Sequence, residues 1–139
     1  MGYPINLNDL QRYRLYEVLL LQESKGVPHW RRTERIYDAL KISQIEELDR
    51  KARESGGEPH KYEVKQVPSV YYLDEADLEY LNRLVKDWDK EDGLPKALTN
   101  ASRDWRVFLP LMDAVVNAYE ARKEASKSNG EATEKVQNA

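Results

Sequence analysis

The carboxylates of residues 87–93 are the first group with a composition suited to chemistry. This segment reads Asp-Trp-Asp-Lys-Glu-Asp-Gly, and carboxylates spaced in this way before a glycine are typical of a calcium-binding loop. An EF-hand loop starting at Asp87 needs glycine at its sixth position and a bidentate glutamate at its twelfth. Here glycine is the seventh residue and Leu98 is the twelfth. We therefore predict no metal site and interpret the segment as a solvated helix end.

The remaining titratable residues form no pattern typical of an enzyme. His29 and His60 have neither a second histidine nor a carboxylate at the helical spacing of metal ligands, and the chain has no cysteine. No nucleophile elbow or glycine-rich phosphate loop is present. Asp74 and Asp77 are explained by helix capping. We therefore expect a non-enzymatic protein with no catalytic residue and no cofactor.

A basic, aromatic face is the best candidate site for a charged partner. It comprises Trp30, Arg31, Arg32 and Arg35, with Arg12 and Arg14 expected nearby on the preceding helix. Arginine can grip phosphate while tryptophan stacks on a base, so nucleic-acid binding is our alternative function. Against it, Glu34 and Asp38 lie within helical reach of these arginines, and the net charge is −3.

Composition restricts the class of protein further. The chain has 139 residues, of which 40% are hydrophobic and 34% charged, so it suits one domain with a modest core. The absence of cysteine excludes disulfides. No run approaches the roughly 18 apolar residues of a membrane span, and the first residues have no features of a secretory signal. We therefore expect a cytoplasmic protein with no membrane partner.

Helical periodicity dominates the first half of the chain. Residues 5–25 should form a helix with a wide apolar face, capped by Asn6, with Ile5 and Leu10 as a hydrophobic staple. A Gly-Val-Pro turn at 26–28 should end it. A second helix over 28–55, bent near Ile42, should then pack antiparallel to the first.

The second half should add two more helices. Residues 61–73 are β-formers interrupted by Pro68, which predicts an extended crossover or a small hairpin. Asp74 should cap a third helix that ends near Lys90. A fourth helix should begin near Thr99 or Ser102 and run to about residue 126, with Pro110 producing a kink or a new start.

These elements predict a mainly α, single-domain helical bundle of about four helices over residues 1–125. Residues 126–139 lose their apolar period and should be disordered. One core should bury Leu15, Leu19, Ile36, Leu40, Leu81, Leu84, Val85, Phe108 and Met112.

Large side chains beyond the needs of this core indicate a contact surface. The chain has nine tyrosines and three tryptophans but one phenylalanine. We expect contacts through Trp105, Leu109, Met112, Val116, Tyr119, Tyr71 and Tyr72. The first five follow a 3–4 spacing along the last helix and form a seam with no assigned partner. In the alternative interpretation, a bend at Pro110 turns that seam inward. We expect a protein-interaction or assembly protein that binds a protein partner or forms a homo-oligomer.

The order of these elements also resembles a known group of proteins. A capped helix, a Gly-Val-Pro turn, a long charged helix, a Gly/Pro loop, an extended segment and a helix opening at Leu73-Asp74-Glu75 cover residues 5–90. This order resembles small uncharacterised helical proteins encoded in phage and prophage genomes. The resemblance implies an accessory or assembly protein that works through contacts, and it assigns no catalytic residue.

Overall fold

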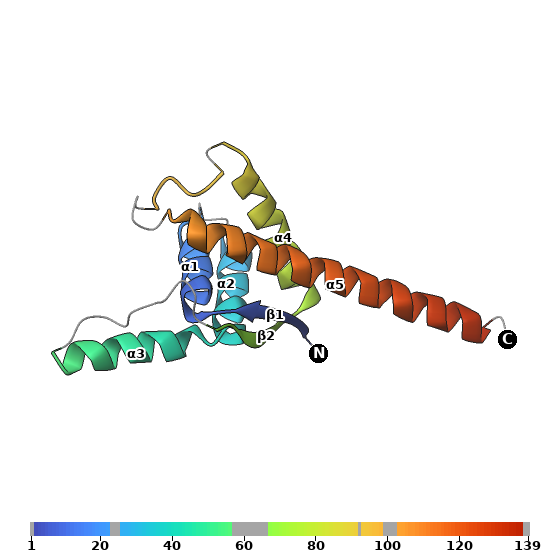
Figure 1. The fold of residues 1–139 in the computed structure, drawn as a ribbon, viewed down its shortest axis with the longest axis horizontal. Helices are drawn as coiled ribbons and strands as arrows, with labels where there is room; N and C mark the ends of the chain where they lie inside the picture. The colour runs from blue at the N-terminus through green and yellow to red at the C-terminus, as the bar shows by residue number, and fades with distance from the viewer. Residues whose placement is uncertain (1, 23–25, 57–66, 92, 99–102, 138–139) are drawn as a thin grey trace.

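The computed structural model describes residues 2–22, 26–56, 67–91, 93–98 and 103–137, with side chains described up to Glu124. Helices hold 70% of these residues, and two strands pair into one small sheet, so the predicted mainly helical fold is confirmed. The elements are β1 (Tyr3–Leu7), α1 (Asp9–Leu20), α2 (Val27–Ala39), α3 (Ile42–Glu54), β2 (Ser69–Leu73), α4 (Glu75–Lys86), the 3-10 turn η1 (Asp87–Asp89) and α5 (Trp105–Gln137). α3 and the carboxyl-terminal part of α5 extend from the body on opposite sides (Figure 1).

The sheet corrects the predicted start of the first helix. β1 and β2 are antiparallel, and Ile5 pairs with Tyr71 in their register. The helix therefore begins at Asp9, where Asn8 and Gln11 form a reciprocal capping box with distances of 2.8 and 2.9 Å. The predicted cap at Asn6 is wrong because the preceding residues pair with a strand that follows more than sixty residues later. The last five residues of the segment 61–73, which was predicted to be extended, form β2. Residues 61–66 lie outside the described residues.

The predicted second helix is two helices. α2 ends at Ala39 and α3 starts at Ile42, with Lys41 between them in the left-handed region at φ 53°. The buried guanidinium of Arg12 donates to the carbonyl oxygens of Leu40 at 2.6 Å and Lys41 at 3.3 Å. These bonds satisfy carbonyls at the end of α2, so the chain can turn there without leaving buried acceptors unpaired.

The two later helices match their predictions in part. Asp74 caps α4 as predicted, since its carboxylate accepts from the Asp77 backbone N–H at 2.8 Å. α5 starts at Trp105, later than predicted, and continues through Pro110 without a new start. Helical backbone reaches Gln137, but the predicted disorder of residues 126–139 stays a prediction because those side chains are outside the described set.

The core is divided into a main cluster and a satellite cluster. Leu15, Leu19, Ile36, Leu40, Leu81 and Val85 share the main cluster as predicted, and Leu84 and Met112 pack against it half-buried. Phe108 instead joins the satellite cluster with Val18 and Leu98. Leu84 and Trp88 touch both clusters. The prediction of one shared core is therefore wrong for Phe108, because the segment bearing Leu98 supplies it with a separate contact.

Candidate protein-interaction surfaces

Packing against α4 divides the predicted seam of α5 into two halves. Trp105 is 69% exposed and Leu109 is 50% exposed, both on the first turns of the helix. Further along, Met112, Val116 and Tyr119 are half-buried against the main cluster. The seam therefore seals the core over its second half and faces solvent over its first half.

The contacts between α4 and α5 explain this division. Trp88, in η1 directly after α4, lies edge-on to Phe108, with ring centroids 5.1 Å apart. Toward the start of α4, Glu75 forms an ion pair with Arg122. These two contacts hold α4 along α5 from Phe108 to Arg122. The half-buried seam residues Met112, Val116 and Tyr119 lie within that stretch and Trp105 precedes it, while Leu109 lies within it and still stays exposed.

The alternation of β2 separates the two tyrosines that were predicted as contacts. Tyr71 is buried, and the Arg12 guanidinium lies 4.6 Å from its ring centroid, so its predicted exposure is wrong. Tyr72 points to the other face and is 60% exposed. Its cross-strand neighbour is Pro4, while Val70, also exposed, is opposite Asn6. We call Pro4, Asn6, Val70 and Tyr72 the sheet face.

The sheet face belongs to two segments without charge. Residues 2–8 and 67–73 contain no Asp, Glu, Lys or Arg, although these residues make up 34% of the chain. Solvent-exposed strands usually carry charges that discourage pairing with other chains. Each strand here also has an outer edge without a strand partner among the described residues. Of this surface only Tyr72 was predicted as a contact; the signal for the rest is the absence of charge in two segments far apart in the chain.

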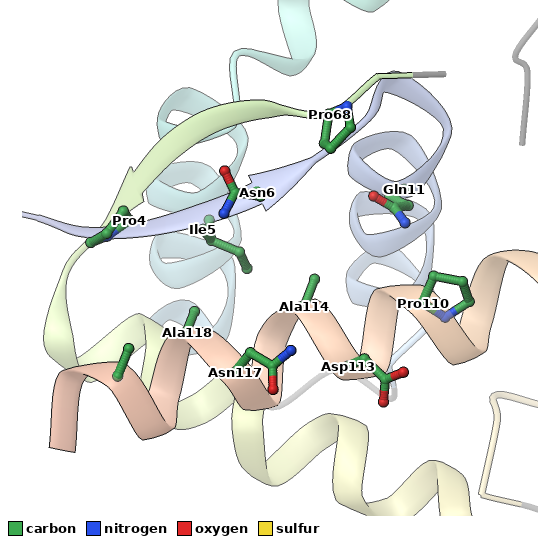
Figure 2. Close-up of a pocket in the computed structure, with 11 residues that line it drawn as sticks. Pro4, Ile5, Asn6, Gln11, Pro68, Pro110, Asp113, Ala114, Asn117 and Ala118 are labelled. Carbon is green, nitrogen blue, oxygen red and sulfur yellow. The ribbon is translucent and has the colours of Figure 1, made fainter. Parts of the chain in front are cut away.

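A groove borders this sheet between β1 and α5 (Figure 2). Its volume is about 500 Å³, and short side chains on α5 form its floor, with Ala114 and Ala118 beneath Ile5 (Figure 2). Pro4, Pro68 and Pro110 lie on its rim, and Asp113 is the one titratable residue that lines it. A groove with a single carboxylate and no histidine suits packing against another chain better than acid–base chemistry.

The predicted basic face is largely neutralised within the chain. Arg35 donates to both oxygens of the buried Asp77 carboxylate at 2.9 and 3.1 Å, and these hydrogen bonds raise the pKa of Arg35 further. Arg32 lies 3.7 Å from the same carboxylate and stacks over Tyr80, with its guanidinium 4.3 Å from the ring centroid. Trp30 and Arg31 are exposed, and so is Arg35, although it is paired with Asp77.

The two arginines of α1 do not extend that face. Arg12 is buried and also pairs with Asp9 at 2.5 Å, and Arg14 pairs with Glu17 at 2.8 Å. Both serve contacts within α1 or at the end of α2. The residues predicted for nucleic-acid binding are therefore brought together only in part.

The described residues contain no group of three or more histidines and carboxylates placed to hold a metal ion. His29 is buried beside Trp30, and Asp87 in the former calcium-loop candidate pairs with Lys90 at 3.1 Å. His60 lies outside the described residues. Within the described part of the chain, no helix is both long and apolar enough to cross a membrane.

Comparisons with known proteins found no matching family model, no matching curated protein and no matching solved structure. The resemblance to helical proteins of phage genomes therefore stays a prediction.

Proposed function

We propose that this protein is a non-enzymatic assembly protein that self-associates through its sheet face. The observation that carries the proposal is the exposure of Tyr72 and Val70, at 60% and 50%, on a sheet without a single charged side chain. Exposed apolar residues scattered singly are ordinary, but here the register places them on one continuous face.

A second copy of the chain is the partner that this surface fits best. A two-fold contact brings the same patch of each subunit together, so a charge near the symmetry axis would meet its own copy. The sheet face has no charge, and it therefore meets itself without repulsion. The outer edge of β2 contains neither proline nor a charged residue, so it can also pair with its own copy in antiparallel fashion.

Light scattering on the purified protein tests this proposal. We expect a mass above the monomer value of 16.3 kDa that rises with protein concentration. The double variant Val70→Thr and Tyr72→Thr places residues with high strand propensity at both positions but removes the apolar contact, and it should remain monomeric.

Leu48→Gln is the matched control, because Leu48 is another exposed apolar residue, 44% exposed on α3. This variant should associate like the wild type. A wild type that stays at the monomer mass at every soluble concentration contradicts the proposal. If Leu48→Gln lost association as fully as the double variant, the assignment of the contact to the sheet face would be wrong.

A further inference from the structure

A second hollow lies among α1, α2 and α3, and it differs from the groove in its chemistry. It has a volume of about 360 Å³ and is lined by Tyr16, Trp30, Thr33, Glu34, Tyr37 and Glu46. We call it the aromatic hollow. Three of its side chains are aromatic and two are carboxylates, and no cationic residue lines it.

Contacts with neighbouring side chains hold the aromatic walls in place. The rings of Tyr16 and Tyr37 pack with centroids 5.2 Å apart at an angle of 58°. Trp30 is 44% exposed and lies edge-on to the buried ring of His29, with 5.1 Å between centroids. Thr33 is fixed by a 3.0 Å hydrogen bond to the His29 carbonyl oxygen. The walls are therefore ordered while the tryptophan remains open to a ligand.

The carboxylates give the hollow a negative potential that the chain does not neutralise. Glu34 and Glu46 are exposed and form no ion pair with any residue in the described part of the chain. Burial and the nearby Glu46 carboxylate both raise the pKa of Tyr37, and the same two causes raise that of Tyr16. The adjacent Glu47 shows the contrast, because it pairs with Arg50.

We propose that the aromatic hollow binds an arginine side chain presented by a partner protein. Aromatic faces attract a guanidinium through their quadrupoles, and carboxylates accept its N–H donors. The planar guanidinium offers more donors than a lysine ammonium and stacks on rings, which suits a site with both features.

The chain itself uses this arrangement repeatedly. Guanidinium groups lie 4.6, 4.3 and 4.8 Å from the ring centroids of Tyr71, Tyr80 and Tyr119, respectively. Two of these arginines, Arg12 and Arg32, also lie within 4 Å of an aspartate. In the aromatic hollow the rings and carboxylates are present, and the cation must come from outside the described residues.

Nuclear magnetic resonance of the full chain tests the site through the indole N–H signals. Titration with N-acetylarginine amide should shift the Trp30 signal saturably, while the signals of Trp88 and Trp105 stay in place. The neutral isostere N-acetylcitrulline amide should bind roughly three- to tenfold more weakly, because it lacks the charge. N-acetyllysine methylamide should also bind more weakly than the arginine amide.

Matched variants locate the effect. Glu46→Gln should weaken binding of the arginine amide several-fold, whereas Glu47→Gln on the same helix should leave it unchanged. The proposal would be overturned if the arginine and citrulline amides bound with equal affinity, or if Glu46→Gln and Glu47→Gln weakened binding equally. A shift of the Trp105 signal as large as that of Trp30 would also overturn it. Tighter binding of the lysine amide would overturn the assignment to arginine. The Val70→Thr and Tyr72→Thr variant should bind the arginine amide normally, so failure at the sheet face and failure here are distinguishable.

Discussion

The arginine-rich side of α2 and the uncharged sheet reverse the roles that their residue types suggest. Arg32 and Arg35 have the chemistry of a phosphate-binding site, yet a single buried carboxylate, Asp77, occupies both. The sheet has no charged side chain, yet Val70 and Tyr72 remain exposed. A surface is therefore available for a partner when its side chains lack contacts within the chain, whatever their residue type.

Arg12 provides the strongest test of the internal use of arginine. Arg12→Met should lower the free energy of unfolding by about 3 kcal/mol, because the buried carbonyl of Leu40 and the carboxylate of Asp9 lose their partner. Urea denaturation measures the loss. Arg50→Met is the control, since Arg50 is exposed and its pairs with glutamates on α3 are screened by solvent, so the loss should be far smaller. Similar losses in both variants would contradict the structural role of Arg12.

Asp77 should have the next effect in size. Asp77→Asn keeps the side-chain volume but removes the charge that Arg35 binds, so we expect a loss of about 1–2 kcal/mol in the free energy of unfolding. The variant should also gain salt-sensitive binding to a short DNA duplex in a fluorescence anisotropy assay, since Arg32 and Arg35 lose the negative charge of Asp77. Equal DNA binding by the wild type would show that Asp77 does not neutralise this face.

The sheet face should matter little for folding. Val70→Thr with Tyr72→Thr should change the free energy of unfolding of the monomer by less than about 1 kcal/mol, because both side chains are exposed. Denaturation at low protein concentration, where association is absent, gives this value. A loss as large as that of Arg12→Met would mean that the sheet face is part of the core and not a contact surface.

The smallest expected effect is a change in the pKa of Glu47 when its partner Arg50 is replaced. Its hydrogen bond with Arg50 lowers the pKa of Glu47 below the usual glutamate value, so any contribution to stability is present above the unfolded pKa and is lost as pH falls through the folded one. In a carbon-detected pH titration, Arg50→Gln should raise the pKa of Glu47 back toward the usual glutamate value. An unchanged inflection would show that the pair does not form in solution.

Local signals and distant contacts account for what sequence reasoning could and could not predict. The cap at Asp74 was predictable because its bond to the Asp77 N–H spans three residues. The break between α2 and α3 depends on Arg12, 28 residues before the Leu40 carbonyl that it binds. Propensity and periodicity describe neighbours along the chain, so they do not indicate such a contact.

The candidate surfaces show the same limit. The 3–4 spacing of the α5 seam is present, but which of its residues are exposed depends on where α4 and η1 contact α5, with Glu75 near Arg122 and Trp88 at Phe108. Likewise, the alternation in β2 separates Tyr71 from Tyr72, but the core packed against one face of the sheet decides which of them is buried. The exposed half of a pattern is a property of the assembled fold.

Hydrogen exchange of the β2 amides at increasing protein concentration tests self-association through the sheet most directly. We predict that protection over residues 67–73 rises with concentration, that α2 stays unchanged, and that the rise disappears in the Val70→Thr and Tyr72→Thr variant. Protection of β2 that does not depend on concentration, or a rise confined to the start of α5 around Trp105, would contradict the account.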